Sequence, residues 1–132
     1  MFRDTKAFSG FAVPDIVAAK AFYGDTLGLD VTWGSPRGAG EDHGMLTLHL
    51  AGSRDTIVYP KPDHVPATYT ILNFPVDDVE AAVDALTEKG VEFQKYEGED
   101  FATDAKGIMR QGGPLIAWFT DPAGNILSVL QP

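Results

Sequence analysis

Apolar and polar positions follow the same order twice along this chain of 132 residues. In the first half, residues 8–13 mix aromatic and small apolar side chains and end before a proline, which is typical of a short strand. Apolar residues then recur at helical spacing over residues 16–23, so the pattern predicts a helix that Asp15 caps and Gly28 ends. Apolar runs bounded by turn residues predict three more strands, over residues 29–33, 45–50 and 56–59.

The order restarts after residues 60–68, where three prolines resist both helix and central strand and predict a linker. A strand is predicted over residues 70–76, and a second helix follows that Asp77 or Asp78 caps. Glu80 lies three residues after Asp77, as in a capping box, and Lys89 with Gly90 ends the helix. Further strands are predicted over residues 91–96, 107–111, 115–119 and 125–130, with the turn TDPAGN between the last two.

The repeat is visible in the letters themselves. VPDIVAAKAF, residues 13–22, returns sixty-three residues later as VDDVEAAVDA, residues 76–85. Each copy supplies a strand, a helix and further strands, and two such copies can bury together the apolar faces that neither buries alone. The sequence therefore predicts an α+β protein of two βαβββ modules, residues 6–60 and 69–132, within one domain.

Charge and composition restrict the partners. The net charge is −9, which disfavours nucleic acid and anionic membrane because both require a basic patch. The acidic balance serves either general solubility or the attraction of a cationic ligand. No apolar run is long enough to cross a bilayer, and MFRDTKAFSG lacks the features of a signal peptide, so we expect a cytoplasmic protein. The chain has no cysteine, which excludes thiolate metal sites and a cysteine nucleophile.

Three segments carry a resemblance to a known family: FAVPDIVAAKAFYGDTLGLDV, LNFPVDDVEAAVDALTEKGVEF and AWFTDPAGNILSVLQ. The chain resembles the vicinal oxygen chelate superfamily, which includes glyoxalase I, extradiol dioxygenases, and fosfomycin- and bleomycin-resistance proteins. The D-P-x-G-N turn between the last two strands is common in that family. The resemblance implies paired βαβββ modules that form a curved mixed sheet around a cavity, and it implies a homodimer.

The resemblance also implies where a metal would bind. Family members that use a divalent ion hold it with four side chains, usually His, Glu or Gln. The corresponding positions are Phe8, Ile71 and Ser128, with the remaining one near Tyr59. Phe and Ile have no lone pair, and Ser is a weak ligand for a divalent ion. We therefore expect no metal and no other cofactor, as in the bleomycin-binding branch, where the cavity binds a small molecule.

Other residues are candidates for contact with that molecule. In MLTLHL the alternation places the leucines toward the core and His49 toward either cavity or solvent. Tyr59 and Asn73 can orient a ligand, although Asn73 is equally well explained as a hydrogen-bonded buried amide. The aromatic residues offer flat walls, unless they simply fill the core. They are Phe8, Trp33, Phe74 and Trp118.

Alternatives remain for one acidic loop and for the function. Glu97, Glu99, Asp100 and Asp104 form either a solvated loop or an acidic mouth of the cavity. The chain is either a binding protein or a glyoxalase-like lyase, isomerase or dioxygenase. An enzyme would need a displaced metal site, or acid–base catalysis by His49, Tyr59 or a loop carboxylate. A structural module with an empty pocket is the third possibility. His43 and His64 lie in loops without metal-site spacing, and no catalytic residue is identified.

Overall fold

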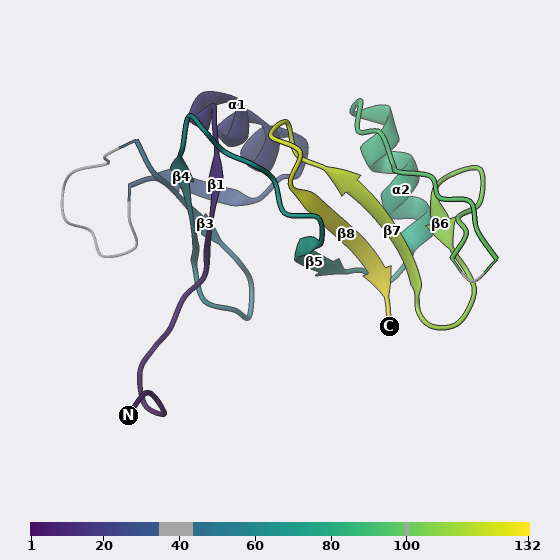
Figure 1. The fold of residues 1–132 in the computed structure, drawn as a ribbon, viewed down its shortest axis with the longest axis horizontal. Coiled ribbons are helices and arrows are strands. Elements are labelled where there is room, and N and C mark those ends of the chain that lie inside the picture. Colours follow the sequence, from purple (N-terminus) through teal and green to yellow (C-terminus); the bar gives the residue numbers. More distant parts are fainter. Residues whose placement is uncertain (35–43, 100) are drawn as a thin grey trace. The chain divides into compact units, whose positions relative to one another are not determined.

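A computed structural model describes residues 1–34, 44–99 and 101–132. The chain divides into two compact units, residues 1–64 and 65–132, so the division falls within the stretch predicted as a linker. Each unit contains one four-stranded mixed sheet and one helical segment (Figure 1). The predicted α+β class is confirmed. No helix in the described ranges is both long and apolar enough to span a membrane.

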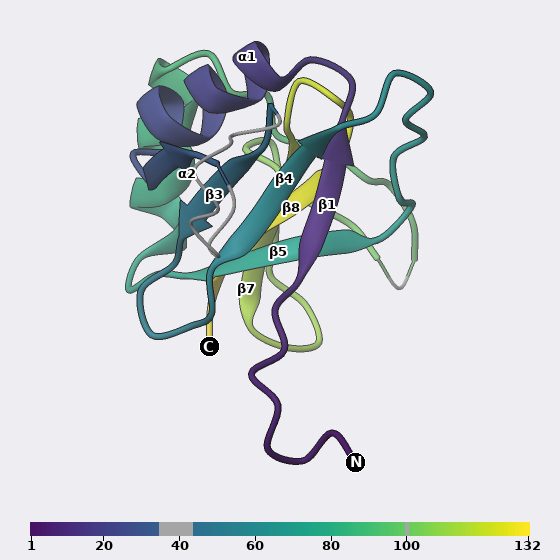
Figure 2. The same ribbon diagram turned by 90° about the vertical axis from the view of Figure 1, so that its left-hand side faces the viewer.

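The sheet of the first unit has the strand order β1-β4-β3-β2. β1 pairs with β4 in parallel, and the other pairs are antiparallel. Figure 2 shows β4 between β1 and β3. The strands are β1 (Gly10–Val13), β2 (Asp30–Trp33), β3 (Leu46–His49) and β4 (Thr56–Pro60). The strand predicted to begin at Phe8 thus begins at Gly10, and the remaining bounds differ from the predicted ones by at most one residue.

The first helical segment has two parts, α1 (Ile16–Lys20) and the π-helix η1 (Ala21–Thr26). Asp15 caps α1 as predicted, because its carboxylate accepts the N–H groups of Val17 and Ala18. The single helix predicted up to Gly28 is wrong in its second half. There the Leu27 N–H donates to the Phe22 carbonyl, five residues back, which is the π pattern.

The core of the first unit lies on the sheet face that α1 covers. Tyr23 of η1 and three strand residues, Leu46, Leu48 and Val58, are fully buried there. The Tyr23 ring packs on Phe11 of β1, with centroids 5.6 Å apart. The predicted inward direction of the leucines of β3 is therefore confirmed. Side chains that alternate with them point to the opposite face.

The sheet of the second unit has the order β5-β8-β7-β6, with β5 parallel to β8 and the other pairs antiparallel. The strands are β5 (Thr70–Pro75), β6 (Ile108–Met109), β7 (Leu115–Thr120) and β8 (Ile126–Gln131). Figure 1 shows β8 between β5 and β7. The buried apolar side chains of the two central strands alternate along each strand, and they face α2 (Val79–Glu88). They are Ala117, Phe119, Leu127 and Val129.

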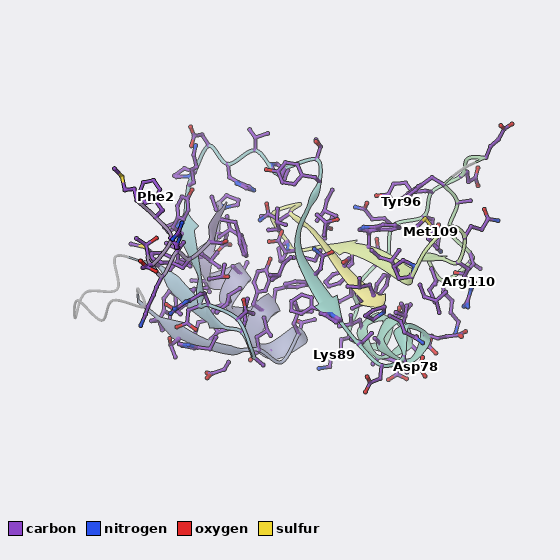
Figure 3. The ribbon with its side chains drawn as sticks, turned by 90° about the horizontal axis from the view of Figure 1, so that it is seen from below. Phe2, Asp78, Lys89, Tyr96, Met109 and Arg110 are labelled. Carbon is purple, nitrogen blue, oxygen red and sulfur yellow. The ribbon has the colours of Figure 1, made fainter. Side chains whose placement is uncertain are left out.

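Asp78 is the residue that caps α2, since its carboxylate accepts the N–H of Ala81. The capping box predicted from Asp77 to Glu80 is therefore wrong. Glu80 points instead to Lys106, whose ammonium lies 3.3 Å from its carboxylate. The helix ends as predicted at Lys89, and Gly90 follows with a φ of +90°. Asp78 and Lys89 are labelled at the two ends of this helix in Figure 3.

The strand predicted over residues 91–96 is not formed. Only Phe93 makes a bridge, to Phe119 of β7, and the Gln94 N–H donates to the Trp118 carbonyl. The rest of that edge of β7 is taken by β6, which pairs with Ala117 and Ile116. The chain therefore leaves the sheet after Gln94 and forms a loop.

Candidate functional site

One face of the second sheet carries a row of three side chains that the sequence singled out. Trp118 of β7 pairs with Ser128 of β8, and Ser128 pairs with Asn73 of β5. Register partners point to the same side of a sheet, and this side is opposite to the one that α2 covers. The Ser128 hydroxyl donates to the Asn73 side-chain oxygen at 2.6 Å. Ser128 is fully buried, whereas Asn73 is exposed, so the amide nitrogen of Asn73 is the group this pair can offer to a ligand.

A cluster of three aromatic rings lies on the same face, next to that row. Tyr96 meets Trp118 edge to face with centroids 5.9 Å apart, and Phe101 lies over Trp118 at 5.1 Å with a tilt of 39°. Tyr96 and Phe101 are 5.2 Å apart. The Tyr96 hydroxyl donates to the side-chain oxygen of Gln94. We call Tyr96, Phe101 and Trp118 the ring cluster.

The loop that carries two of these rings is closed at its base. The Thr103 N–H donates to the Tyr96 carbonyl at 3.0 Å, and the Tyr96 N–H donates to the Thr103 hydroxyl at 2.8 Å. Gly98 within the loop approaches the Phe101 carbonyl so closely that a Cβ would lie 3.1 Å from that oxygen. Tyr96 lies on the side of the unit that carries β6, where Met109 is labelled (Figure 3).

An ion-pair network holds the chain after this loop against α2. Arg110 Nε donates to Asp104 at 2.9 Å, and its Nη2 lies 3.5 Å from Glu80. Lys106 Nζ bridges Glu80 and Asp84, which are one turn apart on α2, at 3.3 and 3.0 Å. Arg110 is labelled in Figure 3. The Asp104 carboxylate is therefore engaged in an ion pair and hydrogen bonds within the unit. Among the described residues of the loop, Glu97 and Glu99 have exposed carboxylates.

The network shifts the ionisation of its members. Burial by itself raises the pKa of the Asp104 carboxyl, but donors from the Ile108 N–H, the Arg110 guanidinium and the Lys106 N–H outweigh it and lower the pKa. Hydrogen bonds to Asp84 and Glu80 raise the pKa of the Lys106 ammonium. Asp104 and Lys106 are therefore charged near neutral pH.

Two predicted site residues of the second unit lie apart from the row. Phe74 pairs with Val129, so it points to the α2 side, opposite to Asn73. Ile71 lies at a register shift between Thr70 and Leu72, and this β-bulge breaks the alternation that relates Ile71 to Asn73.

The predicted residues of the first unit are also divided between two faces. His49 and Tyr59 alternate with the buried Leu48 and Val58, so both lie on the face away from α1. Trp33 pairs with Leu46, so it points to the face that α1 covers, opposite to His49 and Tyr59. Its place at the end of an edge strand leaves it 46% exposed. Phe8 precedes β1 and is 42% exposed.

His49 is held from both sides. Its Nδ1 lies 3.2 Å from Asp55 Oδ1, and its Nε2 lies 2.9 Å from the hydroxyl of Thr32 on β2. The carboxylate favours the tautomer with the proton on Nδ1, which leaves Nε2 to accept from Thr32. His43 and Asp100 lie outside the described residues, and His64 follows β4 in the first unit.

The internal repeat places the second implied metal position. Ser128 pairs with Asn73, which lies five places before Asp78, the cap of α2. In the first unit the residue five places before the cap is Gly10, which pairs with Ile57. Ile57, rather than Tyr59, is therefore the register counterpart of Ser128. Tyr59 lies two residues further along β4 on the same face.

These positions do not fit a divalent ion. Phe8, Ile57 and Ile71 are hydrocarbons, and the Ser128 hydroxyl donates to Asn73. Across residues 1–34, 44–99 and 101–132, no three side chains of His, Asp or Glu gather in an arrangement that could hold a metal.

The sequence interpretation missed Tyr96 and Phe101. Both lie where it predicted a strand end and a charged loop, and neither belongs to a periodic pattern. The available signal was composition: Phe93, Tyr96 and Phe101 are three aromatic residues within nine positions of an otherwise charged segment.

Comparison with known proteins agrees with this architecture. A solved structure of a Glyoxalase/bleomycin resistance protein/dioxygenase superfamily member from Sphaerobacter thermophilus DSM 20745 covers 100% of both chains with a TM-score of 0.69 at 22% identity. TnmS3, an antibiotic binding protein from Streptomyces sp. CB03234, is 26% identical, with 98% of each chain covered and a TM-score of 0.64. A glyoxalase family protein from Enterococcus faecalis is 24% identical, covers 99% of this chain and 100% of its own, and has a TM-score of 0.66.

The search among curated proteins found no match. A family model, Glyoxalase/Bleomycin resistance protein/Dioxygenase superfamily, matches residues 8–129, which include β1, both helical segments and all but the end of β8. The match spans both copies of the repeat. The chain therefore belongs to the glyoxalase/bleomycin resistance protein/dioxygenase superfamily.

Proposed function

We propose that this protein binds a small, partly aromatic molecule without a metal ion, on the sheet face that carries Trp118, Ser128 and Asn73. The observation that carries the proposal is the row itself: an indole face beside an exposed amide whose orientation the Ser128 hydroxyl sets. Sites for small molecules combine apolar, often aromatic walls with a few oriented polar groups. The row and the ring cluster have this composition.

The donor set supports the metal-free part of the proposal. The family positions that would hold an ion carry hydrocarbon side chains or the Ser128 hydroxyl, which donates to Asn73. They do not suit a metal ion that would act as a Lewis acid. The 26% identical TnmS3, described as an antibiotic binding protein, supports binding as the function. Sequestration of a toxic metabolite or antibiotic is the use we infer.

A cationic ligand fits the charge of the chain best. The net charge is −9, and Glu97 and Glu99 are exposed in the loop that carries the ring cluster. Neighbouring carboxylates add attraction for a cation that lies over an aromatic face. We infer a flat ring system with a positive charge.

Three acridines of one ring size test this inference. We expect 9-aminoacridine, a cation at neutral pH, to bind more tightly than uncharged acridine, and acridine-9-carboxylate to bind least. Calorimetric titration measures the affinities. Added salt is expected to weaken the binding of the cationic probe only. Trp118→Ala is expected to lose binding about 5-fold or more, because a buried ring contact of this kind contributes roughly 1–3 kcal/mol.

Trp33→Ala is the matched control, since Trp33 is exposed and belongs to the other unit. Equal losses in the two variants would show that the probes bind nonspecifically. Tight binding of the anion, or binding by none of the three probes, would reject the proposed ligand class.

Assembly and location are part of the same proposal. We infer a cytoplasmic homodimer, as is usual in the resembled family, which does not engage nucleic acid. Native mass spectrometry of untagged protein measures the subunit number and the mass of any ligand carried through purification. A monomer at micromolar concentration would reject the dimer.

One observation favours an enzyme as the second candidate. Asp55, His49 and Thr32 form a chain of carboxylate, imidazole and hydroxyl, the arrangement in which a neutral His can accept a proton. A carried ligand found by native mass spectrometry would then change mass on incubation with the wild type but not with His49→Gln. An unchanged ligand in both proteins would favour binding alone.

A further inference from the structure

The Phe101 ring packs on the Trp118 indole. Their centroids are 5.1 Å apart and their planes are tilted by 39°, which makes this contact the closest and the least perpendicular within the ring cluster. The proposed function gives the same indole to the ligand. The two rings cannot cover the same face of Trp118 together, so the contact has to be explained before the site is understood.

The surroundings of Phe101 and Tyr96 differ. Tyr96 is fixed by its hydroxyl on Gln94 and by two hydrogen bonds with Thr103. The Phe101 side chain has no hydrogen-bonding group, and it remains 43% exposed although it packs on two rings. Moving the Phe101 side chain therefore breaks no side-chain hydrogen bond, whereas moving Tyr96 does.

The chain on the C-terminal side of the ring cluster is anchored. Thr103 closes the loop onto Tyr96, and Asp104 accepts two backbone N–H groups and the Arg110 guanidinium. A change at Phe101 can consequently remain local to its side chain. Trp118 itself belongs to a central stretch of β7 and stays in the sheet.

We propose that Phe101 is a placeholder on Trp118: an aromatic ligand displaces the Phe101 ring from the indole and takes over its contact. This inference rests on the proposed function and assigns a residue that sets affinity at the same site. It predicts that loss of the Phe101–Trp118 contact on binding reduces the affinity for the ligand. Phe101 thereby selects for ligands whose rings stack on the indole better than a phenyl ring does.

The test uses the full chain with Trp33→Phe as background, so that Trp118 is the only tryptophan and reports on its own face. Phe101→Ala is expected to raise the acrylamide quenching of Trp118 emission in the absence of ligand. With 9-aminoacridine as the probe, the same variant is expected to bind about 2- to 10-fold more tightly, the range that one aromatic pair supplies. Phe101→Leu keeps apolar bulk without a flat ring, so its affinity for the probe is expected to lie between those of the background protein and Phe101→Ala.

Phe2→Ala is the control, because Phe2 is an exposed aromatic residue of the N-terminal segment, which carries no candidate site residue before Phe8. It is expected to change neither quenching nor affinity. Circular dichroism of each variant confirms that it folds. Weaker probe binding in Phe101→Ala would show that Phe101 is a wall of the site, and equal binding would show that it does not affect the site. Either result would overturn the placeholder alone. No probe binding in either protein would overturn the proposed function and the placeholder together.

Discussion

Gly107 shows at the scale of one residue how tightly the loop below the ring cluster is packed. Its φ is +91°, and an added Cβ would lie 2.9 Å from Phe93 Cβ and 3.0 Å from the Gln94 carbonyl oxygen. The close approach allows the chain to return to the edge of β7 as β6, next to the segment that holds Gln94 and Tyr96. A side chain here must either move that backbone or leave the left-handed region.

Gly107→Ala is therefore expected to destabilise the protein more than Gly112→Ala. Gly112 has a similar φ of +75° with nothing within 4 Å of an added Cβ, so both variants carry the backbone strain but only one carries the overlap. We expect a difference of about 1–3 kcal/mol in the free energy of unfolding, the usual cost of overpacking. Urea denaturation of the two variants measures it. Equal losses would show that the backbone at Gly107 yields without cost.

Individual site residues could be inferred from the sequence only where a pattern places them. Trp118, Ser128 and Asn73 stand in strands, and the structure brings these three into one row. Alternation was misleading for Ile71, because a β-bulge adds a residue that no letter of the sequence announces. Phe101 was missed since its position depends on loop closure by Thr103, a contact that has no periodicity.

The elements of the second unit are joined by charge as well as by apolar packing. Asp104 accepts from the N–H groups of Lys106 and Ile108 and from Arg110, while Lys106 reaches Glu80 and Asp84 of α2. Such exposed pairs contribute little one at a time. Asp104 differs because two backbone N–H groups and one guanidinium converge on it.

Stability is expected to depend on pH through Asp104. Its pKa in the folded chain is lowered, so its contribution is present above the ordinary carboxyl pKa of about 4 and is lost as the pH falls through the lowered value. At pH 7, Asp104→Asn is expected to cost about 1 kcal/mol of unfolding free energy after allowance for solvent screening. Urea denaturation at pH 7, 5 and 3 should show this deficit shrinking as the wild type loses the same interaction. Asp4→Asn, in the exposed N-terminal segment, is the control; a deficit that persists at pH 3 would refute the ionic origin.

Most elements follow from local signals that the sequence contains. Asp15 and Asp78 precede apolar runs of helical period, and both act as caps. The failure to predict the end of β-structure after Val91 has a tertiary cause. Whether residues 91–96 form a strand depends on which segment occupies the edge of β7, and β6 holds part of that edge. Competition between segments for one edge is a tertiary property that a local pattern does not contain.

The internal repeat determines the fold of the whole chain, and the side chains at the implied metal positions are the basis of the chemistry that we propose. The two copies and the D-P-x-G-N turn were sufficient to infer the fold, which the family match bears out. Function was less accessible, because a fold of this kind hosts many reactions and binding activities. The sequence indicated which of the implied metal positions are hydrocarbons, but it did not indicate that the loop residues Tyr96 and Phe101 pack on Trp118.

Removal of metal ions is expected to leave the protein unchanged. Dialysis against EDTA should not alter its Tm, and addition of Mn²⁺, Co²⁺, Ni²⁺ or Zn²⁺ should not raise it, because an ion that binds the native state must stabilise it. Native mass spectrometry of protein purified without chelator checks the same point directly. One divalent ion per subunit would contradict the metal-free proposal and direct attention to His49, Asp55 and Tyr59.

The π-helix accounts for a discrepancy in length between the two copies. Thirteen positions separate the cap Asp15 from Gly28, whereas twelve separate Asp78 from Gly90. A π turn takes up one more residue than an α turn over the same axial distance. The first copy is therefore one residue longer than the second between cap and glycine, and η1 (Ala21–Thr26) accommodates that residue. The extra residue of the first copy thus lies inside a helical segment rather than in a loop.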